Sequence, residues 1–479
     1  MKIKARYLIL VAILILGFAL RLYKIHNPVA DWHSWRQADT SAVTRNFVKY
    51  GIDLLHPRYD DFSDVSGKGL FNPHGYRFVE FPIFNLIHYF LFRLYPRLTL
   101  EVWGRLTSVL AALVSAVFLF AYVSRRTRPG IGLLSAFFYL TLPYNIYFTR
   151  TILPDPLMVT FVLAGIYYFD NWFTKSRRLD LVLGIVACTA AILVKPPAVF
   201  FLLPIPYLAW KKYGLKAFKK FYLYLAGFII ILPFIAWRIW MLRYPEGIPA
   251  SGWLLNGNHI RFKGAFFQWL FGQRLGDLIL GNWGLIPFGA GLIAAIGLAP
   301  EFLIWFLSSL IYLTVFATGN IQHDYYQIGI IPSVAILLAI GTHSLFVSRG
   351  SFFQKIARGA LALVSLAFMF AFGWYAVRGD YQVNHWEIVH AGQAVDHLVP
   401  KDAHVVAPYL GDTAFLYQTN RDGFPYMVMP IKDMIDRFNI TYYVSTNFDN
   451  QTNAIMKKYT VTEKTPEFVI VKLVEPKRP

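Results

Sequence analysis

Runs of apolar residues recur from Tyr7 to Val377, and this feature limits the possible folds most strongly. A helix needs about 20 such residues to cross the hydrocarbon core of a bilayer. Strands of a transmembrane barrel are only about 10 residues long and alternate in polarity, so these runs exclude a barrel. Hydrophobic residues make up 56% of the chain and charged residues 15%, which excludes an ordinary soluble domain. The sequence therefore predicts an all-α polytopic membrane protein.

Positive charge indicates which loops lie on the cytoplasmic side. The chain has 46 Lys and Arg residues against 27 Asp and Glu, and many basic residues lie in short loops between apolar runs. Such clusters mark cytoplasmic loops, so an even number of spans must separate successive clusters. The same placement explains the net charge of +19 without a nucleic-acid partner. About eleven spans satisfy this rule: 7–23, 101–124, 131–149, 156–173, 181–194, 197–210, 221–241, 283–298, 300–318, 327–347 and 359–378.

The apolar stretch 83–95 is left out of this count. Only two crossings fit between the first two basic clusters, and the stretches 7–23 and 101–124 are longer. Asn85 and His88 also interrupt its apolar character. We therefore expect an interfacial or re-entrant helix here. The chain is then an integral protein of the plasma or inner membrane, with a cytoplasmic N-terminus and its C-terminal part outside.

Composition divides the chain into a membrane part and a tail. Residues 1–379 are expected to form a transmembrane domain with outer-face loops at 24–100 and 243–282. Residues 380–479 are less apolar and predict a small extracytoplasmic α/β domain. The expected strands of this domain are 403–407, 442–445 and 468–471, and its expected helices are 385–398, 430–438 and 450–458.

The first outer loop carries the carboxylates Asp31 and Asp39. Apolar residues with helical spacing predict a helix from about Ser34 to Tyr50, lying flat at the membrane surface. Asp31 would start this helix, and Asp39 would lie one turn from Arg36. Two interpretations follow: a helix-start residue and a surface ion pair, or a carboxylate that serves as a general base.

Ionisable and aromatic residues at the ends of different spans are also expected on the outer face. Asp155 opens one span, Lys195 closes another, and His323, Tyr325 and Tyr326 precede a third. Charged groups that meet at one membrane edge suggest a functional site. The structural alternatives are a helix cap for Asp155, a lysine that reaches towards water for Lys195, and an interfacial aromatic belt for the other three.

Several motifs occur in a fixed order along the chain: Asp31 to Phe47, Glu80-Phe81-Pro82-Ile83, Leu153 to Leu157, Val194 to Pro197, and His323 to Tyr326. This layout resembles the GT-C superfamily of membrane glycosyltransferases, in particular the branch of protein O-mannosyltransferases and lipid A aminoarabinose transferases. The resemblance implies transfer of a sugar from a polyprenyl-phosphate donor at the outer face of the membrane. It implies no cofactor beyond this donor substrate.

The resemblance also implies roles for individual residues. Counting forward from the first span favours Asp31 as the catalytic base, and Asp39 is the second candidate. Phe81 stands where the family has a lysine, so Arg77 is a possible substitute near Glu80. The implied set for the donor phosphate and sugar is Arg45, Arg77, Glu80, Asp155, Lys195, His323, Tyr325 and Tyr326. No metal site is expected, and Asp60, Asp61 and Asp64 are expected in a mobile loop.

The leading hypothesis is an inverting hexosyl- or pentosyltransferase. The base would deprotonate an acceptor hydroxyl or amine on a glycan, lipid or protein, and polyprenyl phosphate would leave. The alternatives are a flippase or transporter of lipid-linked glycans, and a polysaccharide polymerase or ligase. A transporter would carry its charges near the middle of the bilayer rather than at one edge. Membrane lipids are expected partners in all three cases.

Overall fold

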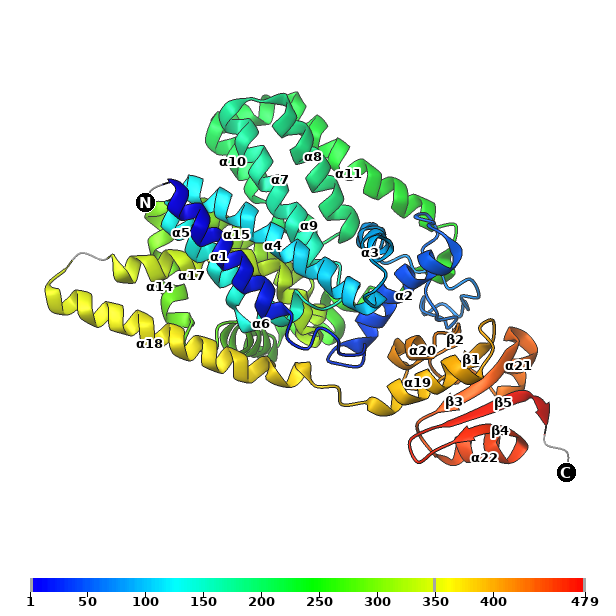
Figure 1. Ribbon diagram of the computed structural model, residues 1–479. Helices are drawn as coiled ribbons and strands as arrows, with labels where there is room; N and C mark the ends of the chain where they lie inside the picture. Colours follow the sequence, from blue (N-terminus) through cyan, green and yellow to red (C-terminus); the bar gives the residue numbers. More distant parts are fainter. Residues whose placement is uncertain (1–2, 348–349, 477–479) are drawn as a thin grey trace. The chain divides into compact units, whose positions relative to one another are not determined.

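The computed structural model describes residues 3–347 and 350–476 and is mostly helical, with one small five-stranded sheet (Figure 1). The predicted fold class, a helical membrane protein with a small α/β part, is confirmed at this level. The chain forms two compact units. Unit 1 comprises Met1–Ile25, Arg105–Ala236 and Ser251–Gly379, and unit 2 comprises His26–Gly104, Trp237–Ala250 and Asp380–Pro479.

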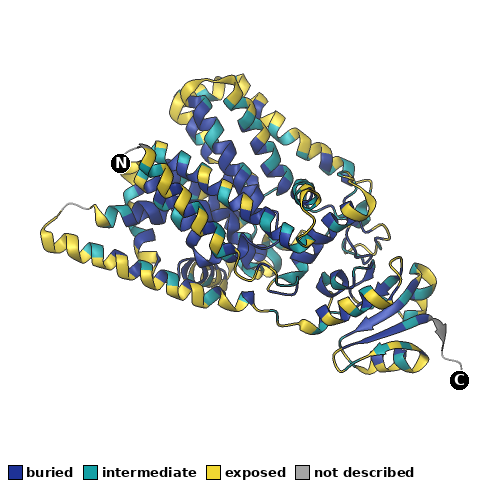
Figure 2. Ribbon diagram, viewed as in Figure 1, coloured by how far each residue is buried: buried dark blue, intermediate teal, exposed yellow. Residues whose placement is uncertain are grey.

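Unit 1 is a bundle of apolar helices. Its most buried long segment is Asp324–Phe346: in the most apolar 18-residue stretch of this segment, 83% is buried. The corresponding share for the segment that begins at Phe352 is 28% (Figure 2). The helices that lie wholly or largely in this unit are α1 (Ile3–Arg21), α4 (Leu100–Arg126), α5 (Pro129–Thr141), α6 (Pro143–Phe148), α7 (Asp155–Lys175), α8 (Arg178–Val194), α9 (Ala198–Phe201), α10 (Pro204–Tyr213), η1 (Gly214–Lys219), α11 (Phe221–Met241), α12 (Trp253–Asn256), η3 (Gly257–Phe262), α13 (Gly264–Phe267), η4 (Gln268–Ile279), α14 (Leu285–Leu298), α15 (Glu301–Val315), α16 (Ala317–Gln322), η5 (Asp324–Ile330), α17 (Ile331–Phe346) and α18 (Phe352–Val377).

The predicted number of spans is not confirmed. Among the described residues, four helical segments are long and apolar enough to cross a membrane: Leu100–Arg126, Phe221–Met241, Asp324–Phe346 and Phe352–Leu398. Two predicted spans are broken, because 131–149 divides into α5 and α6 at Pro143, and 197–210 divides into α9 and α10 at Pro204. Proline has no backbone N–H, so a helix readily ends before it and a new one begins there.

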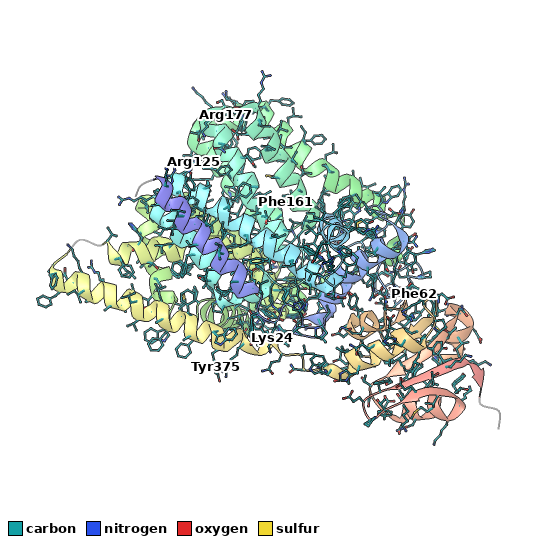
Figure 3. The ribbon with its side chains drawn as sticks, in the orientation of Figure 1. Lys24, Phe62, Arg125, Phe161, Arg177 and Tyr375 are labelled. Carbon is teal, nitrogen blue, oxygen red and sulfur yellow. The ribbon has the colours of Figure 1, made fainter. Side chains whose placement is uncertain are left out.

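Basic loops of unit 1 lie at one end of its helices. Arg126 and Lys211 both approach Glu301, at 3.9 Å and 3.2 Å. Figure 3 shows Arg125 and Arg177 towards this end and Lys24 towards the other. The charge rule requires these loops to share one side of the membrane, and this arrangement agrees with it.

Two glycines bring α14 and α17 into close contact. A Cβ atom added at Gly341 would overlap the backbone oxygen of Pro287, and one added at Gly291 would overlap that of Leu337. Helices inside membranes gain little from the hydrophobic effect, so close van der Waals packing through small residues holds them together. The reciprocal pair therefore fixes the distance between these two helices.

We expect Gly341→Ala to lower the thermal unfolding midpoint of the detergent-solubilised protein. Overpacking of this kind costs about 1–3 kcal/mol because neighbouring backbone must shift. The matched control is Gly297→Ala on α14, where an added Cβ meets nothing within 4 Å. The control should leave the midpoint unchanged or raise it, since alanine favours helix. Equal midpoints for Gly341→Ala and the wild type would show that α14 and α17 do not pack closely.

Unit 2 contains a five-stranded sheet in the order β2-β1-β3-β5-β4. Strand β1 runs parallel to β2 and β3, while β5 runs antiparallel to β3 and β4. Its strands are β1 (His404–Val406), β2 (Gly423–Phe424), β3 (Ile440–Ser445), β4 (Tyr459–Lys464) and β5 (Val469–Pro476), and the helices of the tail are η6 (Arg378–Tyr381), α19 (Trp386–Leu398), α20 (Thr413–Thr419), α21 (Ile431–Phe438) and α22 (Asn450–Lys458). The three predicted strands and three predicted helices of the tail are confirmed, whereas α20, β2 and β4 were not predicted.

The first outer loop supplies helices α2 (Ser34–Tyr50) and α3 (Ile83–Leu94) to unit 2. The predicted bounds of α2 are confirmed, and its position flat on a membrane surface stays a prediction. Protein covers most of it, including the polar side chains of Gln37 and Ser41. Helix α3 has 12 residues and is thus about 18 Å long, too short for the hydrocarbon core. That it does not cross the membrane stays a prediction.

The stretch around Asp60 and Asp61 is packed rather than mobile, which corrects the expectation from sequence. Asp61 forms a parallel bridge with Gly423, and the backbone N–H of Phe62 donates to the carbonyl of Gly423 at 2.7 Å. Both aspartates are buried. Backbone pairing with the edge strand β2 therefore holds this segment in place.

Candidate functional site

The ten residues predicted to form the site divide evenly between the two units. Unit 1 holds Asp155, Lys195, His323, Tyr325 and Tyr326, and unit 2 holds Asp31, Asp39, Arg45, Arg77 and Glu80. The five residues of unit 1 contact one another, whereas those of unit 2 lie in separate ion pairs and hydrogen bonds.

Lys195 is the centre of the network in unit 1. It follows the last residue of α8, and its Nζ lies 2.5 Å from Oδ1 of Asp155, the first residue of α7. The Nζ also lies 5.4 Å from the ring centre of Tyr325 and 5.1 Å from that of Tyr326. Aromatic faces attract an ammonium group because their quadrupole is negative there. A carboxylate and two rings therefore stabilise the charge of Lys195.

Both structural alternatives for this ion pair are wrong. The N-cap of α7 is Pro154, and the side chain of Asp155 caps no backbone N–H there. Lys195 does not reach freely into water, since its side chain is only 12% exposed and is paired. Oδ2 of Asp155 is buried and has no hydrogen-bond partner among the described residues. One acceptor atom beside the ammonium thus stays available to a ligand.

A frame of buried tyrosines holds the segment from His323 to Tyr326. The hydroxyl of Tyr144 donates to the backbone oxygen of Asp324 at 2.6 Å, and that of Tyr312 donates to the backbone oxygen of Tyr326 at 3.1 Å. The ring of His323 lies 5.5 Å from Tyr325 and 5.4 Å from Tyr326. These contacts fix the rings that face Lys195. Tyr144 and Tyr312 were missed because nothing in their local sequence indicates this contact.

In unit 2, both candidate bases are buried and hydrogen bonded. Asp31 accepts a hydrogen bond from Nε2 of Gln37 at 2.7 Å. Asp39 pairs with Arg77 at 2.5 Å and accepts a hydrogen bond from the hydroxyl of Thr413 at 2.6 Å. Burial raises the pKa of Asp39, and Arg77 and Thr413 offset part of this effect. The proposed surface pair of Asp39 with Arg36 is wrong, because Asp39 is buried and bonded to Arg77.

Ion pairs tie α2 to the rest of the first outer loop. Arg36 pairs with Glu80, and Arg45 pairs with Asp60. Arg45 also stacks over the ring of Tyr417, 4.0 Å from its centre. Burial lowers the pKa of Arg45, but Asp60, Tyr417 and Glu101 together outweigh this effect, so the pKa is raised. Buried charges are tolerated only when they are paired in this way. Ion pairs therefore hold Asp39, Arg45, Arg77 and Glu80 in place.

Two further carboxyl groups with perturbed pKa values lie in unit 2. Burial raises the pKa of Asp61 to about 6, although Ser63 donates two hydrogen bonds to it. Burial likewise raises the pKa of Asp412, the N-cap of α20, to about 6. Perturbed carboxyl groups often gather at functional sites. The start of α20 was missed, although Asp412-Thr413 before an apolar run is a cap signal for a helix start.

A ring contact links Asp61 to the Asp39 ion pair. Tyr59 donates its hydroxyl to Asp61 at 3.2 Å, and the guanidinium of Arg77 lies 4.7 Å from the centre of the Tyr59 ring. Arg77 in turn pairs with Asp39.

Among the residues that the structure describes, no group of three or more His, Cys, Asp or Glu side chains is placed to hold a metal ion.

Comparison with known proteins agrees with the resemblance noted in the sequence. A family model described as dolichyl-phosphate-mannose-protein mannosyltransferase matches residues 82–240. ArnT from Cupriavidus metallidurans bound to undecaprenyl phosphate has a similar structure, with a TM-score of 0.68, 12% identity and 98% of each chain covered. A search of curated proteins with the sequence gives no match.

Two more distant structures show the same fold. Archaeal oligosaccharyltransferase AglB from Archaeoglobus fulgidus, in complex with an inhibitory peptide and a dolichol-phosphate, has a TM-score of 0.54 at 9% identity, covering 97% of this chain and 74% of AglB. Arabinofuranosyltransferase AftD from Mycobacteria has a TM-score of 0.54 at 14% identity, and the match covers 97% of this chain and 41% of AftD. The chain shares the fold of these enzymes, which confirms at the level of the fold the resemblance to the GT-C superfamily predicted from the sequence.

The raised pKa of Asp61 predicts a pH-dependent difference in stability. Its folded-state pKa of about 6 exceeds the ordinary value of 3.8, so ionisation at higher pH disfavours the folded state. Asp61→Asn keeps the shape and cannot ionise. The unfolding midpoint of Asp61→Asn should therefore rise relative to the wild type between about pH 4 and pH 6, and the difference should stay constant above. A difference that does not change with pH would show that Asp61 is not held in a buried site.

Proposed function

We propose that this protein transfers a sugar from a polyprenyl-phosphate donor to an acceptor hydroxyl or amine at the outer face of the membrane. The observation that carries the proposal is the Lys195 network, a cation held among aromatic rings in a fold of GT-C type. Similar structures were determined with undecaprenyl phosphate and with dolichol-phosphate bound, which supports a lipid phosphate as the donor's leaving group.

The phosphate end of such a donor needs a fixed positive charge. A phosphate oxygen near Lys195 would share the ammonium with Oδ1 of Asp155, while the rings of Tyr325 and Tyr326 keep the group in place. Hydrogen bonds to charged groups are stronger where water is scarce. Lys195 would therefore stabilise the negative charge that develops on the phosphate as it leaves, with His323 as a further donor.

Asp31 is the preferred catalytic base of this proposal. Both carboxylate oxygens of Asp39 are engaged, one by Arg77 and one by Thr413, which suits a structural role. In the reaction, the base accepts the proton of the acceptor group, whose oxygen or nitrogen forms a bond to the anomeric carbon from the opposite side. The bond from that carbon to the phosphate oxygen breaks, and its electron pair leaves with polyprenyl phosphate. A single displacement of this kind inverts the configuration.

The break between α5 and α6 lies within an apolar segment, and broken helices are also typical of transporters. Helix α6 begins at Pro143, so Tyr144 lies in its first turn. The hydroxyl of Tyr144 donates a hydrogen bond to the backbone oxygen of Asp324. The interrupted helix thus supports the segment that carries Tyr325 and Tyr326. This role in the Lys195 network favours a glycosyltransferase over a transporter.

We expect Asp31→Asn to abolish sugar transfer while donor binding stays close to that of the wild type. The substitution removes basicity and keeps the size of the side chain and one acceptor oxygen. Transfer would be followed with a radiolabelled polyprenyl-phosphate sugar. The matched control is Asp39→Asn, which should lower the unfolding midpoint because Arg77 loses its buried partner. Loss of transfer in stably folded Asp39→Asn, with activity kept in Asp31→Asn, would instead identify Asp39 as the base.

The role of Lys195 is best tested with its partner neutralised, because Lys195→Ala alone leaves the carboxylate of Asp155 buried without its partner. We expect Asp155→Asn to retain donor affinity. Lys195→Ala in the Asp155→Asn background should weaken it by about tenfold to a hundredfold, equivalent to about 1–3 kcal/mol for a lost charged hydrogen bond. His323→Ala should have a smaller effect in the same direction.

Titration of a labelled donor into these variants measures the affinities. Lys211→Ala is the matched control, since Lys211 also pairs with a buried carboxylate, Glu301, in unit 1. It should bind the donor like the wild type. Equal affinities for the double variant and Asp155→Asn would show that Lys195 does not bind the phosphate, and Arg45 and Arg77 would become the leading candidates.

A further inference from the structure

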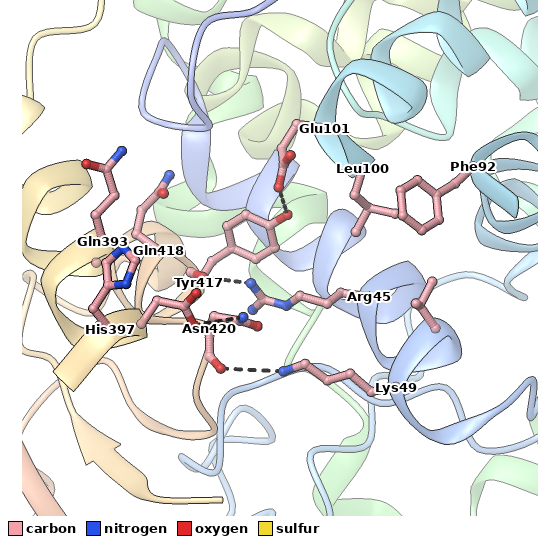
Figure 4. A pocket seen from close by; sticks show the side chains of 13 residues that line it. Arg45, Lys49, Phe92, Leu100, Glu101, Gln393, His397, Tyr417, Gln418 and Asn420 are labelled. Atoms are coloured by element: carbon pink, nitrogen blue, oxygen red, sulfur yellow. Dashed lines mark hydrogen bonds between the residues drawn. The ribbon is translucent and has the colours of Figure 1, made fainter. Parts of the chain in front are cut away.

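Unit 2 contains a cavity of about 390 Å³ that the proposed reaction does not use (Figure 4). Its walls come from the last turns of α2, the end of α3, the first residues of α4, and from α19 and α20. Among the predicted site residues, it includes only Arg45. The volume falls within the range of pockets that bind small molecules.

The lining contains two cations, Arg45 and Lys49, and two carboxylates, Glu101 and Asp396, so these charges cancel. Arg45 pairs with Asp60, which lies outside the lining. Asp396 pairs with Lys401 at 2.5 Å and with Arg421 at 3.0 Å, and Glu101 accepts the hydroxyl hydrogen bond of Tyr417 at 2.6 Å. An anion such as a phosphate would meet the two carboxylates in the same walls, and a cation would meet Arg45 and Lys49. The cavity therefore suits a ligand without net charge.

Several polar groups in the walls lack partners within the protein. The side chain of Gln393 is exposed and makes no hydrogen bond with any described residue, while Oδ1 of Asn420 and Nε of Arg45 are buried without one. Gln393 and Asn420 carry amides, which both donate and accept hydrogen bonds. A ligand that donates and accepts at several points would satisfy these groups, and a sugar hydroxyl does both.

Apolar side chains form another part of the lining. Val48, Phe92 and Leu100 line the cavity, and Figure 4 shows Phe92 and Leu100 opposite Gln393 and His397. A pyranose ring has the same division, with hydroxyl groups at its edge and C–H groups on its faces. Such C–H faces pack well against apolar and aromatic groups.

We propose that this cavity binds a neutral saccharide. The amides of Gln393 and Asn420 bind its hydroxyl groups, and the apolar wall covers its ring. That this saccharide is part of the acceptor rests on the proposed function, whereas its binding does not. The assay below contains no lipid-linked donor, so failure to bind a saccharide and failure to transfer a sugar are observed separately.

The test uses the full-length protein in lipid nanodiscs on a glycan array that carries neutral and acidic oligosaccharides. The strongest neutral glycan is then titrated by calorimetry into the wild type and two variants. Gln393→Ala removes an exposed amide, and Asn420→Gly removes a side chain at a left-handed position with φ of 53°, which glycine adopts readily. Each should weaken binding by about threefold to tenfold, as expected for one lost hydrogen bond.

Matched controls are available in the same unit outside the cavity. Asn439→Gly changes an asparagine with the same φ of 53° after α21, and Gln451→Ala removes an exposed amide on α22. Both controls should bind the glycan like the wild type. The proposal is overturned if no neutral glycan binds, if only acidic glycans bind, or if Gln393→Ala and Asn420→Gly both keep the wild-type affinity.

Discussion

The hydrocarbon core of a bilayer offers no hydrogen-bond partners to a polypeptide backbone, and this constraint determines the architecture of unit 1. Within a helix, backbone groups form hydrogen bonds with one another, but the N–H groups of the first turn and the C=O groups of the last turn have no partner inside the helix. Breaks and polar residues therefore collect where helices end. Asp155 begins α7 and Lys195 follows α8, so the ion pair between them joins two helix ends. The same constraint that shapes the bundle thus also places its charged groups.

Burial of charge follows one pattern in both units. Lys195 has Asp155 and two tyrosine rings, Arg77 has Asp39 and the ring of Tyr59, and Arg45 has Asp60 and the ring of Tyr417. A carboxylate compensates the charge, and an aromatic face covers the remaining side of the cation. Such a group is fixed in position and loses little entropy when a ligand arrives. At Lys195, this rigidity suits the binding of an anionic leaving group.

Much of this fold could be predicted from residue patterns, and the failures have physical causes. The bounds of α2 followed from helical spacing, and β1, β3 and β5 followed from short apolar runs. The breaks at Pro143 and Pro204 were not predicted because the apolarity of a segment does not show where its helix ends. Strand β4 was not predicted from the sequence. One of its faces is exposed, so its sequence Thr460-Val461-Thr462-Glu463 contains few apolar residues.

Residues of the candidate site could be grouped from the sequence only where they lie at the ends of different helices on the same side of the membrane. Asp155, Lys195 and Tyr326 were expected together because parity placed the ends of their spans on one side. The partners of Asp39 could not be predicted in this way, since Arg77 and Thr413 lie in segments remote in sequence. In a helix, Arg36 would have been the nearest cation, yet it pairs with Glu80 instead. Because long-range packing decides such pairing in a buried region, a carboxylate one turn from an arginine identifies a charged segment, but not the base within it.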